Sequence, residues 1–255
     1  MTKLIDIIIP CYKSHKTIKK TLSSIASQVG AERVQVSIIH RPEESYLDEI
    51  NRFSGLLDIQ SFTSPENASI GKARQIGIDN TKCKYIMFCD SDDILHDNFV
   101  LEKFINTFEQ NAKLNAVYGQ ILALNDNVLT PIGSNHWIWI FGSMFKREFL
   151  AKNEIRYTDT SAGEDCGFNK QVKMFSDINT IKFLNDFTYV WTDWNKENRV
   201  NTVSFAFVDS KKDLIKNTIY AINSETSHQY NSNSYYLQGY ICKKILENKT
   251  FINTL

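Results

Sequence analysis

The sequence contains few of the residues that mark specialised protein classes. Its five cysteines are scattered and form no C-x-x-C pair, which argues against zinc knuckles and a disulfide framework and favours free thiols in a reducing compartment. Ten glycines and four prolines are too few for a collagen-like or low-complexity chain. Because 29 basic residues balance 29 acidic ones, the overall charge gives no reason to expect a nucleic-acid partner.

Long apolar runs are also missing. No stretch approaches the roughly 20 apolar residues that a membrane-spanning helix needs. The N-terminal segment KLIDIIIPCYK is short, holds an aspartate and contains a proline, which is not the pattern of a signal peptide. We therefore expect a cytoplasmic protein, and peripheral association with the inner face of a membrane stays an open alternative.

The chain does have a regular alternation of strand-like and helix-like segments. The strand candidates are residues 4–9, 34–40, 57–64 and 85–89, and the helix candidates are residues 18–29, residues 46–53 and a segment that opens at Ser69. Short Ile-rich runs suit strands that are buried on both faces. Such alternation predicts a parallel α/β sheet, which binds its ligands at the carboxyl ends of the strands.

Three carboxylates follow the fourth strand candidate, in the segment YIMFCDSDDIL. Asp90, Asp92 and Asp93 stand close enough to repel one another, which suits a surface turn, a helix N-terminus or a cation site. Asp93 is expected to cap the helix that carries Phe99 and Val100. Asp90 and Asp92 offer oxygen ligands of the kind that Mg²⁺ or Mn²⁺ prefers, so we predict a divalent cation here.

A second acidic pair, Glu164 and Asp165, precedes apolar residues at helical spacing. Phe168, Val172 and Phe175 place the pair in the first turn of an amphipathic helix. Two acids at a helix start can simply complement the helix dipole. The pair therefore becomes a catalytic candidate only together with other motifs.

The segments around this pair predict further elements. Residues 115–133 read as two strands joined by a turn at residues 125–127. Trp137, Trp139 and Phe141 alternate, so they share one face of an extended segment. Residues 205–255 read as two amphipathic helices, which we expect to pack on the core as an extension; a membrane-edge surface is the alternative.

Four segments in this order resemble the family 2 glycosyltransferases of GT-A fold. They are IDIIIPCYKSHKTIKKTLSSIASQ, SIGKARQIGID, YIMFCDSDDIL and GEDCGF, and the likeness spans residues 3 to 202. The resemblance implies an α/β, Rossmann-like mixed sheet, mostly parallel and flanked by helices, in a domain of residues 1–204. It also implies inverting transfer of a sugar from a nucleotide-sugar donor to a hydroxyl on a glycan or glycolipid acceptor.

On the donor side, the resemblance assigns roles to several residues. Asp90, Ser91 and Asp92 form the D-x-D segment, in which Asp92 is the direct ligand of the cation and Asp90 lies nearer the ribose. A cation there stabilises the charge that builds on the departing diphosphate. The segment with Pro10 and Tyr12 matches the part of the family that lies against the base and ribose. The donor-side residue carried over from the A-R-x-x-G segment is Arg74.

On the acceptor side, the resemblance makes Asp165 the general base, in preference to Glu164. Glu164, Trp137 and Trp139 would face the acceptor, where aromatic rings stack on sugars. Packing in the core is the alternative for the tryptophans.

Two departures from the family pattern stand out. Relatives usually end the second strand with an Asp pair that reads the base, whereas this chain has IIHRPEES, in which Glu43 or Arg41 would substitute. Relatives often carry a His that completes the metal shell, and Trp194 or Asn195 stands in that place. Either the cation has fewer protein ligands here, or Asp193 or Asn198 replaces the His, and Arg199 would hold the diphosphate directly.

Three other functions are alternatives to the transferase. A phosphohydrolase of the D-x-D-x-T type needs a threonine where this chain has Ile94, and a sugar-phosphate nucleotidyltransferase needs a glycine-rich loop that PCYKSHKT lacks. The alternative that stays open is a catalytically impaired nucleotide-sugar or glycan-binding module of the same fold.

Overall fold

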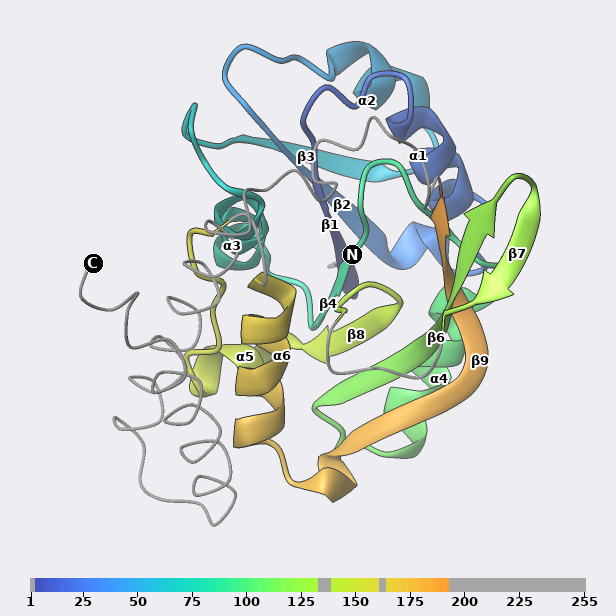
Figure 1. Ribbon diagram of the computed structural model, residues 1–255, viewed down its shortest axis with the longest axis vertical. Helices are drawn as coiled ribbons and strands as arrows, with labels where there is room; N and C mark the ends of the chain where they lie inside the picture. Colours follow the sequence, from blue (N-terminus) through green and yellow to red (C-terminus); the bar gives the residue numbers. More distant parts are fainter. Residues whose placement is uncertain (1–2, 133–138, 161–163, 193–255) are drawn as a thin grey trace, which may run out of the picture.

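A nine-stranded mixed sheet forms the centre of the protein. Its structure, a computed structural model, describes residues 3–132, 139–160 and 164–192 (Figure 1). The strands are β1 (Ile5–Pro10), β2 (Val34–His40), β3 (Asp58–Thr63), β4 (Tyr85–Phe88), β5 (Ile94–Leu95), β6 (Ala116–Asn125), β7 (Val128–Pro131), β8 (Ser143–Lys146) and β9 (Ile181–Thr192). The helices are α1 (Ile18–Ala26), α2 (Leu47–Phe53), α3 (Ile70–Asn80), α4 (Val100–Gln110), α5 (Arg147–Lys152) and α6 (Glu164–Phe175), with 3₁₀ turns at Ala31–Arg33 and Ile178–Thr180.

The sheet has a parallel half and a mixed half. Its strand order is β3-β2-β1-β4-β8-β6-β9-β5, and β7 pairs with β6 outside this order. The first four strands along the chain are parallel, as the alternation of strands and helices predicted. β8 runs antiparallel to both β4 and β6, whereas β6 and β9 are parallel to each other. The predicted strand pair at residues 115–133 is also present, as β6 and β7.

The register of β1 and β4 brings two sequence motifs to one edge of the sheet. Ile5 pairs with Tyr85 and Ile8 pairs with Phe88 in parallel register. The residues that follow each strand therefore emerge side by side at the carboxyl ends, which is where such sheets bind ligands.

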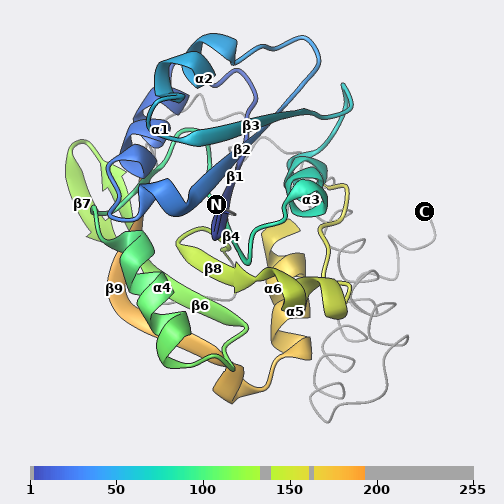
Figure 2. The ribbon, with the colours of Figure 1, turned by 180° about the vertical axis from the view of Figure 1, so that it is seen from behind.

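Helices cover both faces of the central strands. In Figures 1 and 2, α3, α5 and α6 lie on one side of β1 and β4, and α1 and α4 lie on the other. Ring contacts confirm both layers: Phe168 of α6 meets Phe88 edge to face at 5.7 Å, and Tyr85 stacks on Phe108 of α4 at 4.5 Å. Burying each such ring contributes roughly 1.5–3 kcal/mol.

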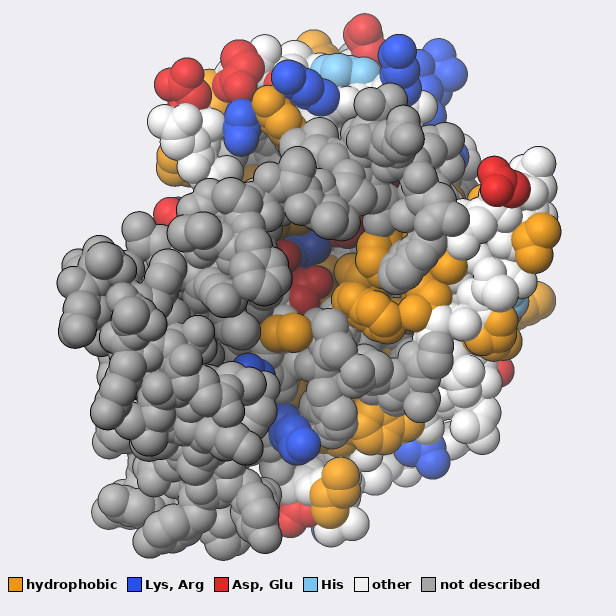
Figure 3. Space-filling model, viewed as in Figure 1, with side chains coloured by type: hydrophobic (Ala, Val, Ile, Leu, Met, Phe, Trp, Pro, Cys, Tyr) orange, Lys and Arg blue, Asp and Glu red, His pale blue; other side chains and the backbone are white. Residues whose placement is uncertain are grey.

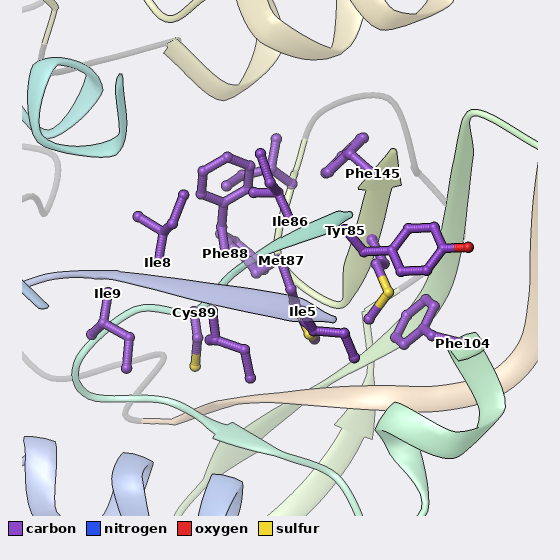
Figure 4. Close-up of a cluster of buried hydrophobic side chains, with 14 of the residues drawn as sticks. Ile5, Ile8, Ile9, Tyr85, Ile86, Met87, Phe88, Cys89, Phe104 and Phe145 are labelled. Carbon is purple, nitrogen blue, oxygen red and sulfur yellow. The ribbon is translucent and has the colours of Figure 1, made fainter. Parts of the chain in front are cut away.

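The core is built from the alternating side chains of β1 and β4 (Figure 4). Successive residues of a strand point to opposite faces, so both faces of an Ile-rich strand are apolar. The side chains labelled in the close-up are Ile5, Ile8, Ile9, Tyr85, Ile86, Met87, Phe88, Cys89, Phe104 and Phe145. The sequence expectation of strands buried on both faces is thus confirmed for β1 and β4.

Close packing of α3 on β1 depends on a glycine. A Cβ added at Gly77 would lie 2.5 Å from Cγ2 of Ile8, far inside normal contact distance. Glycine therefore lets the helix axis approach the strand more closely than any other residue would.

Several expectations concern parts of the chain that the structure does not describe. The domain boundary at residue 204 and the helical extension of residues 205–255 lie beyond the described residues. Among the helices of the described part, none combines the length and apolar character needed to cross a membrane. The cytoplasmic location and the peripheral membrane association stay predictions.

Candidate active site

β4 delivers residues 90–93, the acidic turn, to the edge of the sheet where β1 also ends. Within the turn, the amide of Asp93 donates to the carbonyl oxygen of Asp90 at 3.1 Å. Ser91 is buried, and its Oγ lies 2.6 Å from Oγ of Ser14. The turn is therefore fastened to the loop that follows β1.

Arg74, from α3, joins the acidic turn to the start of α6. Its Nη2 donates to Asp90 Oδ1 at 2.9 Å, and its Nη1 donates to Glu164 Oε1 at 2.8 Å and to Asp165 Oδ1 at 2.9 Å. The Arg74 side chain is only 1% exposed. Burial lowers the pKa of Arg74. The negative charges of Asp165, Asp90 and Glu164 outweigh burial, so the pKa of Arg74 lies well above its usual value. A buried cation is tolerable because carboxylates pair with it.

Asp165 holds a proton more tightly than an ordinary aspartate does. Burial raises the pKa of Asp165 well above its usual range, and the ion pair with Arg74 offsets only part of this effect. A carboxylate with a raised pKa is a stronger base. Because the Asp165 side chain is 14% exposed, it is not sealed from a substrate.

The start of α3 is held against the segment that leads into α6. Ser69 Oγ accepts from the amide of Lys72 at 3.1 Å, so Ser69 is the N-cap of this helix, which opens there as the sequence predicted. The same hydroxyl donates to Asp159 Oδ1 at 2.7 Å. A Cβ added at Gly71 would lie 2.2 Å from the carbonyl oxygen of Thr158. These contacts set the spacing between α3 and α6, and hence between the guanidinium and the acidic pair.

The loop after β1 and the end of β2 form the predicted nucleotide side of the site. The guanidinium carbon of Arg41 lies 3.9 Å from the centre of the Tyr12 ring, which is a cation–π contact. Glu44 Oε1 accepts from the amide of Lys13 at 2.5 Å, whereas Glu43 is exposed. The nucleotide contacts of this loop and of Glu43 stay predictions. Sequence reasoning did not single out Glu44, although it is the acid held against this loop.

An aromatic group accompanies the acidic residues. The rings of Trp139 and Trp191 meet edge to face at 5.9 Å, and Phe141 stacks on Trp139 at 6.3 Å. Asn169 of α6 donates to the carbonyl oxygen of Trp139 at 2.8 Å. Trp137 lies outside the described residues. Sequence reasoning missed Trp191, because a single tryptophan in a strand carries no motif.

Charged and apolar groups share one hollow on the surface. In Figure 3, acidic and basic side chains lie at the bottom of this hollow, and a group of hydrophobic side chains borders them. A polar centre beside an apolar wall is the usual composition of a ligand site.

Asp93 does not cap a helix, contrary to the expectation from the sequence. The helix in question, α4, begins at Val100 after Phe99, and Asp93 is fully buried. Its carboxylate accepts from Tyr189 Oη at 2.9 Å and from the amide of Thr192 at 2.7 Å. Burial raises the pKa of Asp93, and the neighbouring aspartates raise it further. The expectation failed because nothing in the local sequence shows that β9 returns to this turn.

The chemistry of the acidic turn fits a divalent cation in part. Within the described residues, no three His, Cys, Asp or Glu side chains are grouped so as to hold a metal ion. Asp90 and Asp92 are half-buried oxygen donors, and one oxygen of Asp90 is paired with Arg74. Mg²⁺ commonly takes one or two carboxylates and completes its shell with substrate phosphates and water. The two carboxylates therefore suit a cation that binds together with a diphosphate. Asp193 and Asn198, the candidates for a further ligand, lie outside the described residues, as do Trp194, Asn195 and Arg199.

A sequence model of glycosyl transferase family 2 matches residues 6–175. The chain belongs to this family. The matched range includes Arg74, the acidic turn and the start of α6, which are the parts that the fold brings together. The resemblance found in the sequence is thus confirmed.

The curated relatives that this chain matches are distant in sequence. TarP of Staphylococcus aureus (strain N315), a poly(ribitol-phosphate) beta-N-acetylglucosaminyltransferase, is 24% identical over 89% of this chain and 76% of TarP. The poly-beta-1,6-N-acetyl-D-glucosamine synthase of Staphylococcus epidermidis is 26% identical over 58% of this chain. The match covers only 36% of the synthase, so the chain aligns with about a third of that protein.

Solved structures confirm the GT-A fold. Residues 1–349 of S. aureus TarS in complex with UDP-GlcNAc give a TM-score of 0.77 at 14% identity, over 96% of this chain and 73% of that chain. The mannosyltransferase PcManGT of Pyrobaculum calidifontis, in complex with GDP-Man and Mn²⁺, gives a TM-score of 0.64 at 13% identity, over 94% of this chain and 70% of that chain.

Proposed function

We propose that the chain is an inverting glycosyltransferase that moves a sugar from a nucleotide-sugar donor to a hydroxyl group of a glycan or glycolipid acceptor. The observation that carries this proposal is the buried guanidinium of Arg74, which contacts Asp90 on one side and Glu164 and Asp165 on the other. Two acidic motifs that are far apart in the sequence thus belong to one centre. In a single displacement the base and the donor-binding motif act on the same reacting carbon, so they must lie close together.

In this proposal Asp165 acts on the acceptor. An acceptor oxygen attacks the anomeric carbon, and its proton passes to the carboxylate of Asp165. The bond between that carbon and the donor diphosphate breaks, and its electron pair leaves with the diphosphate. Because attack and departure occur on opposite faces, the configuration at the carbon inverts. The raised pKa of Asp165 supports the role, since a base of ordinary aspartate pKa would take up the proton poorly.

The acidic turn and the loop after β1 form the donor side of the proposal. Asp92 and Asp90 would hold Mn²⁺ or Mg²⁺, which supplies positive charge against the developing diphosphate. Ser91 keeps the turn against the loop through its contact with Ser14. Tyr12 offers its ring to the base, although Arg41 already lies over that ring.

The aromatic group forms the acceptor side of the proposal. Trp139 and Trp191 present aromatic surface near both acidic motifs, since Trp139 is bound to α6 through Asn169 and Trp191 precedes Thr192, which bonds the acidic turn. Aromatic surface of this kind packs against the C–H faces of sugar rings. A sugar ring next to the attacking hydroxyl is therefore the acceptor feature that we propose.

The names of the relatives support a first choice of donor. TarP is an N-acetylglucosaminyltransferase, the S. epidermidis relative makes an N-acetylglucosamine polymer, and TarS has been solved with UDP-GlcNAc. UDP-GlcNAc is therefore the first donor to test, with GDP-Man, the sugar nucleotide of the PcManGT structure, as the comparison.

The deciding experiment follows transfer from these donors to acceptor oligosaccharides in the presence of Mn²⁺, with EDTA as the control. We expect release of the nucleoside diphosphate to depend on acceptor and metal, and NMR of the product to show the opposite anomeric configuration to that of the donor. Retained configuration would contradict the inverting mechanism. Tight binding of a sugar nucleotide without turnover with any acceptor would favour the impaired binding module.

A further inference from the structure

The end of β9 is hydrogen-bonded to the acidic turn, although about a hundred residues separate them in the sequence. Tyr189 Oη accepts from the amide of Asp90 at 2.9 Å and donates to Asp93 Oδ2 at 2.9 Å. The amide of Thr192 donates to Asp93 Oδ1 at 2.7 Å, and the Thr192 hydroxyl donates to the carbonyl oxygen of Asp92. Tyr189 thus holds Asp90, Thr192 holds Asp92, and both residues hold Asp93.

Asp93 and its two β9 partners are shielded from water. Asp93 and Tyr189 are completely buried and Thr192 is 2% exposed, so no solvent molecule readily replaces a lost partner. The Tyr189 hydroxyl accepts a hydrogen bond from Asp90, at the start of the turn, and donates one to Asp93, at its end. A single phenol oxygen therefore fixes the separation between the backbone of Asp90 and the carboxylate of Asp93.

The surrounding strand keeps this oxygen in place. β5 continues the chain directly after the acidic turn and pairs with β9, with Ile94 opposite Val190 and Leu95 opposite Tyr189. The Tyr189 ring also stacks on Phe141 at 5.1 Å. The phenol thus approaches the turn from a rigid element, as a supporting residue of a precise site should.

We propose that Tyr189, acting with Asp93, is a positioning residue that holds the acidic turn in the shape that binds the donor diphosphate and its cation. The inference rests on the proposed function, because it assigns the turn to the donor. It gives Asp93 a role that differs from cation binding. Asp93 is fully buried and bonded to β9, whereas Asp90 and Asp92 are partly exposed.

Tyr189→Phe is the direct test, because phenylalanine keeps the stacked ring and loses only the hydroxyl. We expect the donor KM to rise about tenfold and the affinity for UDP with Mn²⁺ to fall by a similar factor, while kcat stays within about threefold. Tyr118→Phe is the matched control. It removes another buried hydroxyl, bonded to Asn169 Oδ1 at 3.0 Å, and is expected to leave the affinity for UDP with Mn²⁺ unchanged.

Asp93→Asn provides an independent variant. Asparagine still accepts from the amide of Thr192, but it presents an N–H to a phenol that needs an acceptor. Its donor defect should match that of Tyr189→Phe, and the double variant should be little worse than either single one, because both break the same contact. If Tyr189→Phe does not fold, the donor KM and UDP affinity of Asp93→Asn test the inference instead.

The outcomes separate this inference from the proposed function. Binding of UDP with Mn²⁺ by the unaltered protein and equally by the Tyr189→Phe and Asp93→Asn variants would overturn the inference alone. A loss of kcat with unchanged donor KM would also overturn it, since Tyr189 would then act on the chemistry. If the unaltered protein binds no nucleoside diphosphate or sugar nucleotide, the proposed function fails and the inference fails with it.

Discussion

Arg74 is shared by three carboxylates and is almost completely shielded from water. One positive charge cannot neutralise three negative ones, so the cluster keeps an excess of negative charge when all three acids are ionised. Burial and this excess together raise the pKa of Asp165. A second cation beside the acidic turn, or a proton on Asp165, would relieve the imbalance, and the proposed reaction provides both.

Asp165→Asn should lower kcat by roughly 10²–10⁴ with little change in donor affinity, because a general base acts in the transition state. Its raised pKa also predicts that the rate of the unaltered enzyme rises with pH as Asp165 ionises, and that this limb is lost in the variant. Steady-state kinetics across pH measure both. Glu164→Gln is the matched control, and a larger loss of kcat in that variant would assign the base to Glu164.

Asp6 gives a prediction about stability rather than activity. Burial raises its pKa to about 6, although Gln35 Nε2 and Ser37 Oγ donate to its Oδ2 at 2.8 and 2.9 Å. Since the folded state binds this proton more tightly than the unfolded state, the contribution of Asp6 to stability falls as pH rises from about 4 to 6.

Asp6→Asn removes the charge and keeps the shape. We expect the free energy of unfolding at pH 7.5 to increase by up to about 3 kcal/mol, and the difference from the unaltered protein to shrink toward pH 4. Urea unfolding at several pH values measures this. An equal difference at pH 4 and pH 7.5 would show that charge is not the cause.

At the scale of elements, α3 does two things at once. It packs on β1 through Gly77, and it carries the cation that links the acidic motifs. The glycine of the A-R-x-x-G segment thus has a packing reason, and its arginine has an electrostatic one. The position of α3 on the sheet therefore determines whether the Arg74 guanidinium can contact both acidic motifs.

Gly77→Ala should destabilise the fold by about 1–3 kcal/mol, because the new methyl group would meet the Ile8 side chain at 2.5 Å and force the helix outward. Thermal and urea unfolding give the change. Gly55→Ala is the control, since no atom lies within 4 Å of an added Cβ there. If both variants are equally stable, α3 tolerates a larger separation from β1 than the packing suggests.

At the scale of the whole molecule, the site is assembled from distant parts of the chain. α3, the acidic turn, α6 and the end of β9 meet at one edge of the sheet, where parallel strands present their carboxyl ends. A ligand that contacts several of these elements stabilises their arrangement, so donor binding should be visible in the stability of the fold.

UDP with Mn²⁺ at about a hundredfold excess over its Kd should stabilise the protein by about 2.7 kcal/mol, which corresponds to a Tm increase of roughly 5–10 °C for a chain of this size. Differential scanning fluorimetry measures the shift. EDTA and Asp92→Asn should each abolish the metal-dependent part. An undiminished shift in Asp92→Asn would remove Asp92 from the cation site.

The sequence alone determined the parallel half of the sheet, the helix that opens at Ser69, the two acidic motifs and the family. These features are local: Ile-rich runs, helical spacing and short motifs are written in neighbouring residues. The tertiary structure decided which distant residues meet. Strand order and register place Arg74 between both acidic motifs and bring Trp191 against Trp139. They also explain why Asp93 binds β9 instead of capping α4. Contacts between residues about fifty to a hundred positions apart leave no pattern in a single sequence, because burial and the fold, rather than local propensity, select them.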